Sequence, residues 1–297
     1  MNIPGSEAEV AERIVGWLRC PQCHGQLEVS GTEILCPTSG FRGSIREEVA
    51  VMMPDTAESF FDAKHTVMKH GRLNPGEWAL CYAQQTEHLA RSLKPGMRVV
   101  DIGCGPSLPY DRQAGVGVVG LEPSFQSIRE NLQVDLRVFG TAYSMPMGDA
   151  SADAIICFYS VHHMAGATRE ESRSNASRAL REFGRVLKPG GALYIFEMSP
   201  KPHFWCFQRL FWNTLKRMIG KNLDMHFSSA DELEALGRST LPAGVAVTKT
   251  EFKASPFTLL PPIFSLPKIK VPRFIYPLNP VLLEWQMPAD PVARQQS

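Results

Sequence analysis

Residues 99–107 read VVDIGCGPS, the pattern of a buried parallel strand that ends in a tight glycine turn. Gly103 and Gly105 lack a Cβ, so the turn can adopt strained dihedral angles and lie close to a ligand. In an open α/β sheet, ligands bind beyond the carboxyl ends of the strands, where this turn would lie. The next predicted strand, residues 117–121, leads directly to Glu122. A carboxylate at that distance from the turn is placed to accept hydrogen bonds from both hydroxyls of a ribose.

The chemistry around the turn separates two classes of cofactor that use such a motif. Pro106 and Ser107 stand where a dinucleotide-binding motif has its third glycine, which lets a helix N-terminus approach a pyrophosphate. The carboxylate of Asp101, at the end of the strand, would repel a pyrophosphate. The same carboxylate would attract the cationic, amine-bearing end of S-adenosylmethionine. The residues therefore favour a methyl donor over a dinucleotide.

Composition sets broad limits on the chain. Its 297 residues are 44% hydrophobic and carry a net charge of +1, which is typical of a soluble globular protein with one large domain and a smaller appendage. The balanced charge argues against nucleic acid as the main partner. We identify neither a secretory signal nor an apolar run long enough to span a bilayer, so we expect a cytoplasmic protein.

Strand and helix patterns alternate from residue 97 onward, which predicts a doubly wound parallel sheet of the α/β class. The predicted strands are 98–102, 117–121, 136–139, 154–158, 191–197 and 245–252, and a polar-faced helix is predicted over 169–187. The chain divides into a helix and β ribbon (1–54), a helical linker or cap (55–94), a central domain (95–255) with a lid insertion at about 201–240, and a Pro- and aromatic-rich C-terminal extension (256–297). We expect the tail from Pro288 to be disordered.

The N-terminal segment has the form of a zinc ribbon in which one knuckle is incomplete. Cys20, Cys23 and Cys36 occupy three of the four ligand positions, and Ser39 stands where the fourth cysteine belongs. In one interpretation the three cysteines hold zinc together with His24, water or a distant ligand. In the other, which we prefer because structural zinc sites have four ligands, the ribbon has lost its metal and remains as a packed β unit. We therefore expect no bound metal, and reduced thiols rather than disulfides.

The chain from about 99 to 200 resembles the class I S-adenosylmethionine-dependent methyltransferases, in the group with small-molecule and lipid acceptors. Four blocks in the family's order carry this resemblance: VVDIGCG (99–105), GLEPS (120–124), GTAYSMPM (140–147) leading to SADAII (151–156), and LKPGGAL (187–193). The resemblance implies a Rossmann-like, doubly wound sheet of seven strands, methyltransferase activity and S-adenosylmethionine as the cofactor. The ribbon followed by two helices is also similar to the N-terminal arrangement of some ribosomal RNA guanine methyltransferases and of some small-molecule methyltransferases.

The resemblance also implies roles for residues at the strand ends. Asp101 and the glycine turn would line the methionine part of the donor, and Glu122 would bind the ribose. Thr141 and Ala142 would flank the adenine, although many members have an acidic residue at position 141. Tyr159 belongs to the segment where donor and acceptor would meet. The complete predicted cofactor set is Asp101, Gly103, Cys104, Gly105, Glu122, Pro123, Thr141, Ala142 and Tyr159, with Ser124 close to the adenine and Cys104 acting mainly in packing.

The predicted catalytic residues follow the fourth strand of the central domain. Methyl transfer is an in-line displacement at a sulfonium, so the protein has to align the acceptor, exclude water and, for some acceptors, remove a proton. His162 and His163 are candidate bases because histidine titrates near working pH. Tyr159 could orient the acceptor. Alternatively, one histidine caps the next helix or packs as a polar-tipped core residue, and the sequence does not choose between the two histidines.

Aromatic residues outside the four blocks favour an apolar acceptor, such as a lipid-like, polyketide or aromatic metabolite. Phe204, Phe207, Phe211, Leu215 and Met218 share one face of a predicted helix whose basic residues lie elsewhere. Such a helix either packs as a lid, which we prefer, or makes peripheral contact with a membrane. Our first hypothesis is methyl transfer to a hydrophobic small molecule or lipid. The alternatives are a ribosomal RNA base methyltransferase with a zinc ribbon and a non-catalytic binding subunit that keeps the fold.

Overall fold

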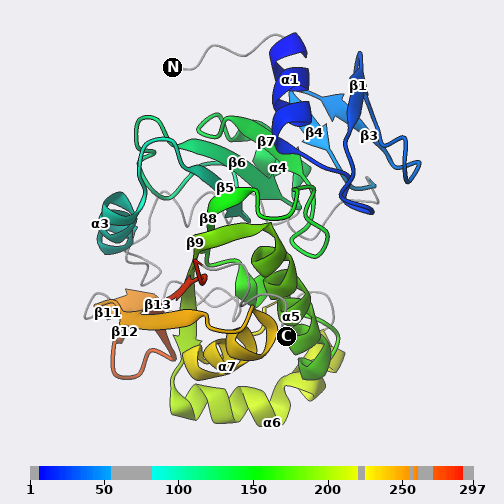
Figure 1. The fold of residues 1–297 in the computed structure, drawn as a ribbon. Helices are drawn as coiled ribbons and strands as arrows, with labels where there is room; N and C mark the ends of the chain where they lie inside the picture. The colour runs from blue at the N-terminus through cyan, green and yellow to red at the C-terminus, as the bar shows by residue number, and fades with distance from the viewer. Residues whose placement is uncertain (1–6, 55–81, 220–224, 254–256, 260–269, 290–297) are drawn as a thin grey trace.

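The computed structural model describes residues 7–54, 82–219, 225–253, 257–259 and 270–289 (Figure 1). Its helices are α1 (Glu7–Trp17), α3 (Tyr82–Ser92), α4 (Phe125–Glu130), α5 (Arg169–Val186), α6 (Pro202–Ile219) and α7 (Ala230–Thr240), with a short 3₁₀ helix, η2, at Val161–His163. Residues 55–81 of the helical linker or cap that we predicted over 55–94 lie outside the described residues. Among the described helices, none combines the length and apolar character needed to cross a bilayer.

One continuous sheet contains eleven strands in the order β1-β2-β3-β4-β7-β6-β5-β8-β9-β13-β10. The N-terminal strands are β1 (Glu28–Ser30), β2 (Glu33–Leu35), β3 (Arg42–Arg46) and β4 (Val49–Val51). The central strands are β5 (Arg98–Ile102), β6 (Gly117–Glu122), β7 (Leu136–Phe139), β8 (Ala152–Phe158) and β9 (Leu187–Pro200), followed by β10 (Ala246–Glu251) and β13 (Leu278–Gln286). A separate pair consists of β11 (Phe257–Leu259) and β12 (Lys270–Pro272).

The central strands confirm the predicted α/β class and the doubly wound arrangement. Strands β7, β6, β5, β8 and β9 are parallel neighbours, so their carboxyl ends lie at one edge of the sheet. Strand β13 runs antiparallel between β9 and β10. It comes from the segment that we expected to be a C-terminal extension, so the sheet continues past residue 255. Strand β9 extends to Pro200, beyond the predicted end at residue 197.

The N-terminal ribbon is joined to the central sheet. Strand β4 pairs in parallel with β7, with Ala50 opposite Val138. Helix α1 packs its apolar face onto the same part of the molecule, where Ile14 and Leu18 are fully buried. The pairing covers an edge that would otherwise leave backbone donors and acceptors without partners. The ribbon therefore extends the sheet that carries the strand-end turns.

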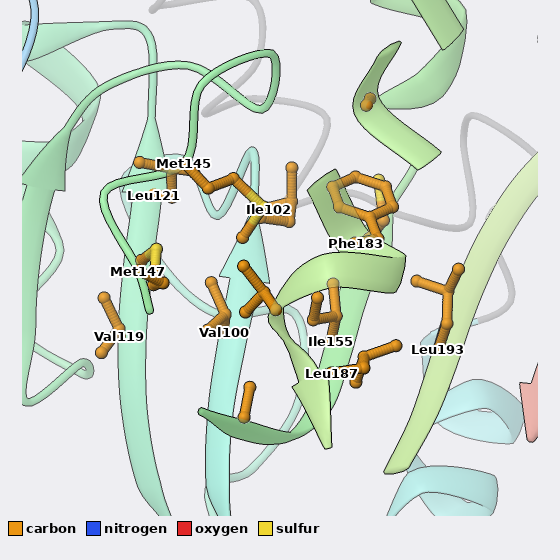
Figure 2. Close-up of a cluster of buried hydrophobic side chains, with 14 of the residues drawn as sticks. Val100, Ile102, Val119, Leu121, Met145, Met147, Ile155, Phe183, Leu187 and Leu193 are labelled. Carbon is orange, nitrogen blue, oxygen red and sulfur yellow. The ribbon is translucent and has the colours of Figure 1, made fainter. Parts of the chain in front are cut away.

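Both faces of the central strands are buried, which explains their continuous apolar sequences. Figure 2 shows Val100 and Ile102 of β5 pointing to the same face as Ile155 of β8, with Phe183 of α5 beside them. Neighbouring residues on the same strands, such as Val99 and Ile156, point to the other face, where Leu89 of α3 packs. These two layers hold the strand ends rigidly in register.

Candidate active site

The turn after β5 approaches the end of β8 closely. Gly103 and Gly105 have φ values of +66° and +60°, a conformation that glycine adopts without strain. A Cβ at position 103 would lie only 2.3 Å from Oγ of Ser160. The Ser160 hydroxyl lies 2.9 Å from the carbonyl oxygen of Phe158 and 3.2 Å from that of Ile102. A side chain at position 103 would therefore force apart the two strand ends that form the site.

The two predicted cofactor carboxylates are buried on neighbouring strands. Asp101 is fully buried at the end of β5, and its Oδ2 accepts a hydrogen bond of 2.8 Å from the hydroxyl of Tyr110. Glu122 at the end of β6 is 1% exposed. Its Oε2 accepts from the amide of Gly105 at 2.9 Å, and its Oε1 accepts from the amide of Ser124 at 3.0 Å. These hydrogen bonds offset the cost of burying the charge and tie the turn after β5 to the turn after β6.

The remaining predicted cofactor residues surround this pair at the same edge. Cys104 is fully buried, and a Cβ at Gly120 would lie 2.8 Å from its sulfur, so Cys104 occupies the packing position that we expected. Pro123, Thr141 and Ala142 are half-buried after β6 and β7. The hydroxyl of Thr141 accepts a hydrogen bond of 3.3 Å from the amide of Tyr143. The side chain of Thr141 is thus used to shape its own turn.

The chemistry of these strand ends fits S-adenosylmethionine. The donor carries a positive sulfonium and an ammonium group, which suit a site that contains Asp101, and a ribose diol, which suits the carboxylate of Glu122. Ser124 caps the N-terminus of α4 by accepting from the amide of Ser127. That cap fixes the turn after β6, which carries Glu122 and Pro123, at the edge of the sheet.

Tyr159, which follows β8, has a strained backbone and is bonded to helix α3, which is far from it in sequence. Tyr159 has a φ of +50°, which is uncommon for a residue with a side chain and typical of functional sites. Its amide donates to the carbonyl of Phe196 at 2.7 Å, and its hydroxyl accepts from Nε2 of Gln85 at 2.6 Å. Gln85, on α3, is fully buried, and its Oε1 has no hydrogen-bond partner among the described residues. This oxygen can accept a hydrogen bond from a bound molecule.

His162 pairs with a buried carboxylate. Nδ1 of His162 lies 2.7 Å from Oε1 of Glu197, and the amide of His162 donates to Oε2 of the same carboxylate at 3.1 Å. Glu197 is 1% exposed and also accepts from the amide of Met198 at 2.7 Å. In the tautomer in which Nδ1–H donates to this carboxylate, Nε2 is the ring nitrogen with a free lone pair. His163 is half-buried, and its ring centroid lies 4.2 Å from that of His162.

The lid insertion forms a wall behind His162. The amide of His226 donates to the carbonyl of His162 at 2.8 Å, and the ring of Phe227 stacks on the His162 ring with 4.8 Å between centroids. Gln208 of α6 holds Phe227 in place through both backbone groups, at 2.6 and 3.0 Å. Burial lowers the pKa of His226 to about 4. This histidine is therefore neutral and acts as part of the wall.

Three residues of this site were missed by the sequence analysis: Tyr110, Gln85 and Glu197. Glu197 had a usable signal, because it is a carboxylate at the carboxyl end of a predicted strand, as Asp101 and Glu122 are. Tyr110 and Gln85 carried no local signal. Their roles depend on hydrogen bonds to residues 9 and 74 positions away.

The three predicted knuckle cysteines come together at the base of the ribbon. The sulfur atoms of Cys20, Cys23 and Cys36 lie within 4.8 Å of one another. The hydroxyl of Ser39 lies 3.1 Å from the sulfur of Cys20, at the position expected for a fourth ligand. Hydrogen bonds from Ser39 lower the pKa of Cys36 to about 6. The cluster has the arrangement of a zinc knuckle with a hydroxyl in place of one thiolate, and the absence of a bound metal stays a prediction.

The fold and the strand-end carboxylates are those that an S-adenosylmethionine-dependent methyltransferase requires. Residues 100–195 match a family model described as a methyltransferase domain. Residues 100–195 thus form a methyltransferase domain, and together with the similar methyltransferases they support an S-adenosylmethionine-dependent enzyme with S-adenosylmethionine as its cofactor. The match covers the strands from β5 to β9, which is the part that carries Asp101, Glu122, Tyr159 and His162.

Two relatives and one solved structure place this domain among known proteins. The chain is 29% identical to the demethylmenaquinone methyltransferase of Renibacterium salmoninarum over 58% of its own length and 68% of the relative. It is 32% identical to the 27-O-demethylrifamycin SV methyltransferase of Amycolatopsis mediterranei, over 37% of this chain and 42% of that one. A chain from the complex of the Haloferax volcanii Trm112 methyltransferase activator with a methyltransferase shares the fold, with a TM-score of 0.53, 18% identity and coverage of 79% of this chain and 100% of that one.

Proposed function

We propose that the protein transfers a methyl group from S-adenosylmethionine to an apolar small-molecule or lipid-like acceptor that loses a proton in the reaction. The observation that carries this proposal is the buried pair of His162 and Glu197 beside the end of β8. A base is needed only when the acceptor atom holds a proton, as in a phenol or a hydroquinone. The names of two relatives, for a demethylmenaquinone and a demethylrifamycin methyltransferase, support an organic small-molecule acceptor.

The residues of the site divide the work as follows. S-adenosylmethionine supplies a methyl group on a positively charged sulfur, so transfer breaks the carbon–sulfur bond as the bond between methyl and acceptor forms. Nε2 of His162 takes the acceptor's proton, while Glu197 holds the ring by Nδ1 and stabilises the positive charge that develops on it. Tyr159 and Gln85 orient the acceptor through their hydroxyl and amide groups. The apolar rings of Phe227 and Phe204 exclude water from the site.

The same proposal places the protein in the cytoplasm, where acceptors that partition into membranes are reached from the bilayer surface. The lid region next to His162 is rich in aromatic side chains, including Phe204 and Phe227, whose ring centroids lie 6.4 Å apart. Aromatic walls of this kind suit an apolar ring or chain. They give a nucleic acid little to bind, and the net charge of +1 lacks the excess of basic residues that is typical of nucleic-acid-binding domains.

The test compares two adjacent histidines and two kinds of acceptor. Release of S-adenosylhomocysteine is measured with alkyl-substituted hydroquinones, whose hydroxyl must lose a proton, and with an apolar tertiary amine, which has none to lose. We expect His162→Gln to reduce turnover of the hydroquinones by about 100-fold or more, the usual range for loss of a general base, and His163→Gln to keep most of it. Calorimetric titration with S-adenosylmethionine should give equal affinities for both variants. Equal turnover by both variants would refute the role of His162, and absence of donor binding would refute the methyltransferase function itself.

A further inference from the structure

Helix α6 turns its apolar face outward. Its buried side contains Gln208, which bonds to the backbone of Phe227, and Trp212, whose ring contacts that of His226. The opposite side carries four exposed apolar side chains, at 45% for Phe207, 73% for Leu210, 48% for Phe211 and 78% for Met218. We had expected Phe207, Phe211 and Met218 to pack inward as a lid, with Phe204 and Leu215. The structure corrects this expectation because the amide of Gln208, needed to hold Phe227, and the indole of Trp212 occupy the inner face.

The exposed apolar residues are concentrated in one place. Eight large hydrophobic residues are exposed in the described part of the chain, and six of them lie on α6 or in the loop before β13: Phe207, Leu210, Phe211, Met218, Phe274 and Ile275. That loop is attached to the start of α6, since the amide of Lys201 donates to the carbonyl of Pro277 at 2.8 Å. Figure 1 shows α6 along the outer edge of the molecule, on the far side of α7 from the sheet. We call these six residues the α6 surface.

Positive charge borders the α6 surface. Helix α6 contains Arg209, Lys216 and Arg217 and no acidic residue. At 100° per residue, Arg217 lies about 20° from Leu210, on one flank of the stripe formed by Leu210, Phe211 and Met218, and Arg209 lies about 80° further round the helix on that same side. Lys201 and Arg273 add two more cations where the helix meets the loop. An apolar stripe flanked by cations is the arrangement of helices that lie in the interface of an anionic bilayer.

We propose that the α6 surface docks on an anionic lipid bilayer, with its apolar side chains among the acyl chains and its cations among the head groups. The same helix reaches the candidate base from its other side, through Gln208 and Phe227, which stacks on His162. One helix therefore separates the bilayer from the site. Docking would let a lipid-like acceptor enter the site from the membrane beside α6, and this consequence rests on the proposed function.

The docking is tested with the full chain and with vesicles, independently of catalysis. Co-sedimentation is measured with vesicles of phosphatidylcholine alone and of phosphatidylcholine with 30 mol% phosphatidylglycerol, a probe composition that supplies the negative charge. We expect binding to the anionic vesicles that weakens at high salt. The double variant L210Q/M218Q should lose at least tenfold in binding, and R209Q/R217Q should lose part of the preference for anionic over neutral vesicles, since Lys216, Lys201 and Arg273 remain. Leu132→Gln, which changes an equally exposed apolar residue elsewhere, should bind as the unaltered protein does.

Unchanged melting temperature and S-adenosylmethionine affinity establish that each variant is folded. Failure of the unaltered chain to bind anionic vesicles would overturn the proposal, as would equal binding by L210Q/M218Q. A dimer in light scattering that becomes a monomer in L210Q/M218Q, without vesicle binding, would also overturn it and would identify the surface as an interface between copies. Turnover of the dispersed hydroquinones is measured without vesicles, so failure of the membrane proposal and failure of the proposed function are distinguishable.

Discussion

We call the region around Asp101 and Glu122 the donor half of the proposed site, and the region around Tyr159 and His162 its acceptor half. The hydrogen bonds that build these two halves span very different distances along the sequence. The donor half is closed by hydrogen bonds from Tyr110 to Asp101 and from Gly105 to Glu122, which join residues 9 and 17 positions apart. In the acceptor half, the corresponding bonds join His162 to Glu197 and Gln85 to Tyr159, across 35 and 74 positions. In the proposed assignment, a donor common to many enzymes would be bound by a compact motif. The acceptor, which differs between enzymes, would be met by residues that only the complete fold brings together.

The largest effect should come from the carboxylate of the acceptor half. We expect Glu197→Gln to reduce turnover of hydroquinone acceptors by about 100-fold or more, because the neutral amide no longer orients His162 and no longer stabilises its charged form. Donor affinity, measured by calorimetry, should stay unchanged, since the donor half is left intact. Turnover of the tertiary amine should fall far less, because that acceptor has no proton to remove.

Another glutamate–histidine pair supplies the matched control for this variant. Nε2 of His88 lies 3.0 Å from Oε2 of Glu284, and both side chains are partly exposed. Glu284→Gln removes the same kind of carboxylate at a place away from the strand ends and should leave turnover within about twofold, as expected for an exposed pair. An equal loss in both variants would mean that Glu197 acts only through stability.

His226, in the wall of the acceptor half, should make the free energy of unfolding depend on pH. Burial holds the pKa of His226 at about 4, against an ordinary value of 6.5. The unfolded chain therefore binds a proton between these pH values when the folded chain does not, so the free energy of unfolding falls as the pH drops from about 6.5 to about 4. The full loss is about 3 kcal/mol. Urea unfolding at pH 7.5 and pH 5 should show the slope in the unaltered protein and much less of it in His226→Gln.

The control for the acid response is His203, an exposed histidine on α6. His203→Gln should keep the full pH dependence of unfolding. If His226→Gln keeps it as well, the acid sensitivity arises from other groups and the wall of the acceptor half contributes nothing to it.

In the donor half, Glu122 is the residue to change. Glu122→Ala should weaken S-adenosylmethionine binding by about 1–3 kcal/mol, because it removes a charged acceptor for hydrogen bonds. The structure adds a second reason, since the carboxylate also holds the amides of Gly105 and Ser124. Glu122→Gln keeps one acceptor oxygen and should lose less. Calorimetric titration gives both affinities, and an unchanged value for Glu122→Ala would remove the ribose assignment.

These distances also explain what the sequence could predict. The strands from β5 to β8 were predicted within two residues of their observed bounds, since each is a short apolar run between turn residues. Asp101 and Glu122 could be identified because strand, turn and carboxylate are adjacent in the chain. The choice of His162 over His163 could not be made, because it depends on Glu197 in another strand. The prediction that the apolar face of α6 packs inward was wrong. Periodicity shows which residues share a face of a helix, but not whether that face points to the core or to the solvent.

The N-terminal ribbon differs from both halves of the site, because its zinc-binding motif is local in sequence but lacks one of the four ligands. The sulfurs of Cys20, Cys23 and Cys36 are already within 4.8 Å of one another, and Ser39 lies at the fourth position. Ser39→Cys should therefore complete a four-thiolate site and bind zinc at least about tenfold more tightly than the unaltered chain. Competition with a chromophoric chelator measures this affinity, and Thr38→Cys, one residue away, is the control that should gain little. Because β4 joins this unit to β7, a bound metal should raise the stability of the unit while donor affinity stays the same. Equal zinc affinity in the Ser39→Cys variant and the unaltered chain would mean that the three cysteines are held by packing alone, in a geometry that no fourth thiolate completes.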